Sequence, residues 1–189
     1  MGVGSIFGII KVGGNAAMTA QIVFLCLGNI CRSPLAEALA RQKFGHLGLA
    51  FSSVGLEADH GLPTSEFSIE FAAGKGASLD GHTPRSVDAE VLADATWLIA
   101  MTRSQGAIAR SRFGDELHGH LGIIGAPGFD LQKHQHSPEV EDVDDPYGWP
   151  RDEYFVCGDQ IDRLLDEWSA TFMEIAESNE TDSKRESLK

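Results

Sequence analysis

The chain has 189 residues, of which 42% are hydrophobic, and this suits one domain that buries a core without disulfide or metal support. Twenty-eight acidic residues against 15 basic ones give a formal charge of −13, which disfavours nucleic acid and anionic membranes as partners. A small anion can still be bound, because a few oriented backbone amides are enough to hold it locally. Three cysteines are too few for a disulfide scaffold and are typical of a reducing compartment.

The N-terminal segment has no features of a membrane span or an export signal. Its longest apolar run, residues 3–10, is far shorter than the roughly 18 residues that cross a bilayer, and no positive charge precedes it. We interpret residues 1–19 as an extension that is disordered or, because Met18 lies just before an apolar run, as a wrongly assigned start. We expect a soluble, cytoplasmic protein with its folded domain over residues 20–176.

Strands and helices alternate along the first half of this domain. The sequence QIVFLC, residues 21–26, is almost entirely apolar and rich in β-formers, which predicts a buried parallel strand. Ser33 and Pro34 are typical of the N-cap and first residue of a helix, here followed by LAEALARQKF. A second strand and two short helices are predicted over residues 49–56, 65–74 and 86–93.

The second half continues the alternation. Further strands are predicted over residues 96–101 and around 120–124, with a helix over 104–114 between them. A proline-rich loop over residues 125–150, one long amphipathic helix over 152–175 and a polar, disordered tail over 177–189 complete the chain. This order predicts an α/β fold with an open, mostly parallel four-stranded sheet and helices on both faces.

The turn between the first strand and the first helix, CLGNICRS, has the properties of an anion-binding loop. Its backbone N–H groups and the positive end of the helix converge on one point, and Arg32 offers a planar fork to two phosphate oxygens. The same field favours the thiolate of Cys26, a nucleophile for phosphoryl transfer. The residues predicted to bind phosphate are Leu27, Gly28, Asn29, Ile30, Cys31, Arg32 and Ser33. The alternative is a buried cysteine that precedes an arginine by chance.

The segment CLGNICRSPLAEA resembles the active-site segment of the low molecular weight protein tyrosine phosphatases. The later sequence Asp144-Asp145-Pro146-Tyr147 is similar to the Asp-Pro-aromatic motif of that family, and the resemblance covers residues 21–168. It implies that Cys26 attacks phosphorus, Arg32 stabilises the phosphate oxygens and Asp145 is the general acid. It also implies that no cofactor or metal is needed. Without the resemblance, Asp145 is one solvated carboxylate of an acidic loop, and Asp144 competes for the acid role.

Further roles are implied only by this resemblance. A hydrogen-bond network that supports the nucleophile would involve Asn29, Ser33, Ser53 and His82. For His82, an exposed loop histidine is an equally good interpretation. Cys31 would form a protective disulfide with Cys26 on oxidation, although a small buried side chain explains it as well. Cys157 is interpreted as an ordinary core residue.

The substrate implied is a phosphotyrosine-containing protein, with inorganic phosphate as the second product. Ile30 and Tyr147, with Trp149 as a further candidate, would form the walls around the aryl ring. The alternative substrate is phosphoarginine, because related arginine phosphatases carry threonine at the position of Ile30 and the sequence MTRSQ, residues 101–105, resembles theirs.

Other classes of function fit less well. A thioredoxin-linked arsenate reductase relays oxidation through cysteines on a mobile middle segment, and residues 74–95 contain none. A phosphopeptide-binding module without activity would be expected to lack the thiol or the acid. The pairs His118/His120 and His134/His136 could hold a metal, but they lack partners and are interpreted as coincidence.

Overall fold

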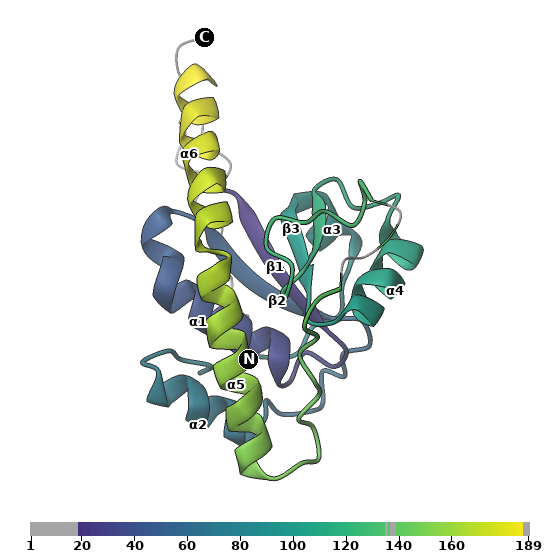
Figure 1. The fold of residues 1–189 in the computed structure, drawn as a ribbon, viewed down its shortest axis with the longest axis vertical. Coiled ribbons are helices and arrows are strands. Elements are labelled where there is room, and N and C mark those ends of the chain that lie inside the picture. The colour runs from purple at the N-terminus through teal and green to yellow at the C-terminus, as the bar shows by residue number, and fades with distance from the viewer. Residues whose placement is uncertain (1–18, 135, 137–138, 187–189) are drawn as a thin grey trace, which may run out of the picture.

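The computed structural model describes residues 19–134, 136 and 139–186, and its centre is a parallel four-stranded sheet (Figure 1). The strand order is β2-β1-β3-β4, with every neighbouring pair parallel. The strands are β1 (Gln21–Cys26), β2 (Ala50–Gly55), β3 (Ala95–Ala100) and β4 (His120–Ile123). This confirms the expected open parallel sheet. The extension at residues 1–18 lies outside the described residues.

Helices cover both faces of the sheet, as predicted. Figure 1 shows α1, α2 and α5 together on one side of the strands and α3 and α4 on the other. The helices are α1 (Arg32–Phe44), α2 (Glu66–Gly74), α3 (Ala89–Asp94), α4 (Arg103–Phe113), α5 (Arg151–Glu167) and α6 (Ser169–Glu186), with a 3-10 turn at Gly45–Leu47. No described helix is long and apolar enough to cross a membrane.

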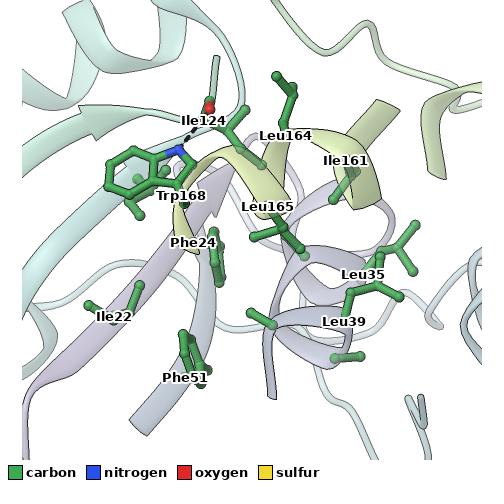
Figure 2. Close-up of a cluster of buried hydrophobic side chains, with 14 of the residues drawn as sticks. Ile22, Phe24, Leu35, Leu39, Phe51, Ile124, Ile161, Leu164, Leu165 and Trp168 are labelled. Atoms are coloured by element: carbon green, nitrogen blue, oxygen red, sulfur yellow. Dashed lines mark hydrogen bonds between the residues drawn. The ribbon is translucent and has the colours of Figure 1, made fainter. Parts of the chain in front are cut away.

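The apolar run of β1 separates the core into two layers, because successive side chains of a strand point to opposite faces. Ile22 and Phe24 pack towards α1, α5 and α6, whereas Val23 and Leu25 pack towards α3 and α4. Figure 2 shows the first of these layers around Trp168, whose indole Nε1 donates to the carbonyl of Ile124 at 2.7 Å. A strand buried on both faces needs this uninterrupted apolar pattern.

The C-terminal region differs from the expectation in two ways. The single helix predicted over residues 152–175 is broken at Trp168, whose N–H is shared between the carbonyls of Leu164 and Leu165 while its indole is buried. Residues 177–186, for which composition predicts disorder, continue α6. In these last turns Ser178 and Thr181 donate to carbonyls four residues earlier, at 2.8 and 2.9 Å. Residues 187–189 lie outside the described residues.

Candidate active site

The β1–α1 loop lies at the carboxyl edge of the sheet, at the point where the strand order reverses on either side of β1. Open parallel sheets bind their ligands at such switch points. Contrary to the expected N-cap at Ser33, α1 begins at Arg32, with Cys31 in the cap position and no side-chain cap bond. Ser33 therefore lies in the first turn of the helix, and its hydroxyl forms hydrogen bonds with residues of the loop instead of capping the helix.

The sulfur of Cys26 is held by two groups of the same loop. The backbone N–H of Asn29 donates to Sγ at 3.2 Å, and the hydroxyl of Ser33 lies 3.0 Å from it. Cys26 is only 2% exposed. Hydrogen-bond donors directed at a cysteine sulfur stabilise its thiolate form, so this arrangement can support nucleophilic chemistry.

Asn29 is the central residue of the loop and is fully buried with a left-handed backbone, φ +55°. Its Nδ2 donates to the hydroxyls of Ser33 and Ser53, both at 2.9 Å, and its Oδ1 accepts from the N–H of Arg85 at 2.9 Å. The ring of His82, through Nε2, lies 2.9 Å from the carbonyl of Asn29. The four residues of the supporting network are thus brought together, and His82 is part-buried rather than an exposed loop histidine.

Glu37 extends this network, although sequence reasoning missed it. Its Oε2 accepts from the hydroxyl of Ser53 at 2.6 Å. A carboxylate can only accept a hydrogen bond, so the hydroxyl of Ser53 donates its proton to Glu37. The oxygen of Ser53 then accepts from the Nδ2 of Asn29. Ser33 also accepts from Asn29, so its own hydroxyl proton is left for the carbonyl of Val54 at 3.2 Å or the sulfur of Cys26 at 3.0 Å. The signal that could have revealed Glu37 is its spacing of four residues from Ser33 on one helix face.

Arg32 connects the loop to the distant acidic segment. Its side chain is 5% exposed, its Nη1 donates to the carbonyl of Val143 at 3.0 Å, and its Nη2 lies 2.5 Å from Oδ2 of Asp145. The carboxylate of Asp145 also accepts from the N–H of Tyr147 at 3.2 Å. Asp144, the competing candidate, lines a different hollow from the one beside Cys26. The structure therefore brings Asp145 rather than Asp144 to the loop.

A cavity of about 200 Å³ opens above the sulfur. Its floor contains Cys26 and Arg32, and Asp145 lies at its edge. Its apolar walls are Leu27, Ile30, Leu62 and Tyr147. Of the residues predicted to bind phosphate, five line this cavity, whereas Asn29 through its backbone N–H and Ser33 through its hydroxyl contact the sulfur of Cys26. Trp149 lies outside the cavity, in a neighbouring groove, so it is not one of its walls.

The other two cysteines are buried free thiols. The sulfur of Cys31 lies 3.8 Å from the hydroxyl of Tyr154. Burial raises the pKa of Cys31 to about 11 and that of Cys157 to about 12. Neither thiol ionises near neutral pH, so Cys26 is the candidate nucleophile of this region.

These two thiols predict a loss of stability in alkali. In the unfolded chain they ionise near their ordinary pKa of 9.0, but the folded protein holds them neutral to about 11 and 12. Their stabilising contribution is complete below the unfolded value and is lost as the pH rises through the folded values. We expect the free energy of unfolding to fall by a few kcal/mol between about pH 8 and about pH 11. Urea unfolding measures this, and Cys157→Ser, which has no thiol at that position, should reduce the fall.

One histidine of each pair has another partner than a metal. Nδ1 of His120 lies 2.7 Å from the carboxylate of Asp130, and the ring of His134 stacks on Phe129 at 4.4 Å. In the part of the chain that the structure describes, no group of three or more His, Cys, Asp or Glu side chains is placed to hold a metal ion.

Comparison with known proteins shows the family of this chain. Residues 21–179 match the family described as low molecular weight phosphotyrosine protein phosphatase. The chain belongs to this phosphatase family. It is 34% identical over 132 residues to the low molecular weight protein-tyrosine-phosphatase YfkJ of Bacillus subtilis, covering 67% of this chain and 80% of that protein.

Two further comparisons bear on this phosphatase. The crystal structure of YfkJ superposes with a TM-score of 0.65 at 29% identity and covers 85% of this chain and 98% of YfkJ. A protein-arginine-phosphatase of Bacillus subtilis is 30% identical over 150 residues, covering 77% of this chain and 91% of the relative. Members of the family with two substrate classes are therefore similar to this chain.

Proposed function

We propose that this phosphatase hydrolyses phosphotyrosine in proteins through a phosphocysteine on Cys26. The observation that carries the proposal is the sulfur of Cys26 held by the N–H of Asn29 at 3.2 Å, on the floor of a cavity that also holds Arg32 and Asp145. Nucleophile, anion-binding guanidinium and acid then face one reacting phosphate. The proposed location is the cytoplasm, where three unpaired thiols stay reduced.

In the first step the thiolate of Cys26 attacks phosphorus, and the bond from phosphorus to the phenolic oxygen breaks. Before substrate arrives, the guanidinium of Arg32 contacts the carboxylate of Asp145. When substrate binds, the phosphate oxygens replace that carboxylate as the partner of Arg32. The buried Nε of Arg32 has no hydrogen-bond partner among the described residues and offers a further donor. Once released from Arg32, the carboxylate of Asp145 takes up a proton from solvent, lies beside the phosphate and gives this proton to the leaving oxygen.

In the second step a water molecule attacks the phosphocysteine. Asp145, now a carboxylate, takes a proton from that water, the bond between sulfur and phosphorus breaks, and inorganic phosphate leaves. The thiolate of Cys26 is the leaving group, and the hydroxyl of Ser33, 3.0 Å from the sulfur, stabilises its negative charge. The hydrogen bonds to Cys26 thus support both steps, because they stabilise the same sulfur atom as nucleophile and as leaving group.

The walls of the cavity support an aromatic substrate. Leu27, Ile30 and Tyr147 give apolar surface to an aryl ring, and the phosphate must reach a buried sulfur at the floor. Phosphoarginine is the second candidate, favoured by the similarity to a protein-arginine-phosphatase.

The test measures phosphate release from a phosphotyrosine peptide and a phosphoarginine peptide of the same sequence. We expect release from the first and little from the second. Preference for phosphoarginine would keep the mechanism and change the substrate, whereas no release from either peptide would refute the proposed activity.

Glu37 provides a test of the supporting network. Glu37→Gln removes the charge from the group that accepts the Ser53 hydroxyl, and so weakens the hydrogen bond that holds Ser53 against Asn29. We expect kcat for a phosphotyrosine peptide to fall about tenfold with KM nearly unchanged, since one charge-assisted hydrogen bond is lost. Arg41→Gln is the matched control, because it removes the ion-pair partner of Glu37 but keeps its carboxylate. Equal kcat values in Glu37→Gln and wild type would refute this role.

A further inference from the structure

A groove beside the catalytic cavity takes no part in the mechanism above. It lies between the loop that follows β4 and the exposed face of α5, and its volume is about 510 Å³, against about 200 Å³ for the cavity. Asp145 borders both hollows, so a peptide bound at the cavity passes next to the groove. Trp149 from the loop and Val156 from α5 give the groove its apolar surface and are 63% and 65% exposed.

The groove carries negative charge that the protein does not neutralise. Asp144 and Glu153 line it, and neither carboxylate has a hydrogen-bond or ion-pair partner among the described residues. The two arginines of α5 have other partners. Arg151 pairs with Glu70 at 2.7 Å, and Arg163 pairs with Glu141 at 2.5 Å. Two free carboxylates beside an exposed indole form a surface that is complementary to a long cationic side chain.

We propose that this groove binds a lysine or arginine side chain that lies close to the phosphotyrosine in the substrate. The inference rests on the proposed phosphotyrosine activity. The aliphatic part of such a side chain packs on Trp149, and its charged end reaches the carboxylates of Asp144 and Glu153. An acidic residue at the same place is repelled. The groove therefore selects phosphotyrosine sites with a basic neighbour.

The cavity itself does not offer the same binding site. Besides Asp145, its acidic lining residue is Glu57, whose carboxylate lies 3.4 Å from the guanidinium of Arg112. Leu62 beside it is apolar. Among the residues that line the cavity and the groove, the carboxylates with no partner in the described part of the chain are thus Asp144 and Glu153 of the groove, which predicts that a basic residue is preferred on one side of the phosphotyrosine only.

The test uses phosphotyrosine peptides that differ in one residue. Lysine, alanine or glutamate is placed in turn at each position from three residues before to three residues after the phosphotyrosine, and kcat and KM are measured. We expect one or two adjacent positions at which lysine raises kcat/KM over alanine by about three- to tenfold, as expected for exposed ion pairs and one cation–π contact. The gain should arise from a lower KM.

Variants separate the groove from the overall charge of the protein. In the double variant Asp144→Asn/Glu153→Gln the lysine-to-alanine ratio of kcat/KM should approach one, and a general loss of activity cancels within that ratio. Asp115→Asn/Glu116→Gln is the matched control, because it also removes two exposed carboxylates and both residues precede β4. This control should keep the ratio of the wild type. Equal kcat/KM values for lysine and alanine peptides, or a preference that survives in the double variant, would overturn the proposal.

Failure of the groove and failure of the proposed activity give different results. If no peptide releases phosphate, the proposed activity fails, and binding then tests the groove alone. For that purpose the affinity of Cys26→Ser for fluorescently labelled lysine and alanine phosphopeptides is compared. Tighter binding of the lysine peptide, lost on adding Asp144→Asn/Glu153→Gln, supports the groove, and equal affinities refute it.

Discussion

Replacing Cys26 by serine is expected to reduce phosphate release from a phosphotyrosine peptide to less than about one ten-thousandth of the wild-type rate. The reason is the chemistry of the atom at the floor of the cavity. Sγ accepts the N–H of Asn29 at 3.2 Å and lies 3.0 Å from the hydroxyl of Ser33, an environment that stabilises a thiolate. A serine hydroxyl is not ionised near neutral pH, and no histidine lines the cavity to remove its proton.

The same substitution leaves the anion-binding part of the site in place. A serine oxygen can still accept the N–H of Asn29, and the guanidinium of Arg32 is held by Val143 and Asp145, so Cys26→Ser should still bind the phosphopeptide and should unfold in urea at nearly the wild-type midpoint. Calorimetric titration with the intact peptide measures the first property. Residual turnover above about one per cent of the wild-type rate in Cys26→Ser would contradict the nucleophile assignment.

Replacing Asp145 by asparagine is expected to lower kcat for phosphotyrosine by about a hundredfold or more, because general acid catalysis contributes effects of this size. Asparagine keeps an oxygen that can accept from Arg32, so the contact between loop and acidic segment survives while the transferable proton is lost. The loss should be much smaller for p-nitrophenyl phosphate, whose leaving group is less basic and needs little protonation. Steady-state kcat on the two substrates measures the difference.

A matched control removes one charge from the same loop. Glu139→Gln changes an exposed carboxylate that lines neither the cavity nor the groove, and it should leave kcat within about twofold of the wild type. Equal losses of kcat on both substrates in Asp145→Asn would indicate damage to the site rather than loss of an acid. A greater loss in Asp144→Asn than in Asp145→Asn would move the acid to Asp144.

The candidate nucleophile and its loop depend on residues that are close together in the sequence. Cys26, Arg32 and Ser33 belong to one loop of consecutive residues, and an anion-binding turn at a helix N-terminus is built from local backbone geometry. The apolar run of β1 is also a local pattern. For this reason the parallel sheet and the candidate nucleophile could both be predicted from the sequence alone.

The local pattern is less reliable where neighbours in space compete with neighbours in sequence. Serine is a residue type favoured at the N-cap, but α1 begins at Arg32, and the hydroxyl of Ser33 lies 3.0 Å from the sulfur of Cys26 instead. The amphipathic pattern across Trp168 predicts one helix, but burial of the indole against the layer beneath α5 ends that helix at Glu167. In both cases a tertiary contact outweighs a propensity of about 1 kcal/mol.

By itself, the sequence determined the order of strands and helices and the loop that carries Cys26, because both depend on residues close together in the chain. Only the tertiary structure decided which carboxylate meets Arg32, since Asp145 lies 113 residues away and Asp144 is chemically equivalent to it. It also decided that Glu37 accepts a hydrogen bond from Ser53 behind the loop, and that Trp149 lines the groove rather than the cavity. Composition and spacing carry no information about such contacts, because they depend on how separate segments pack around one sheet.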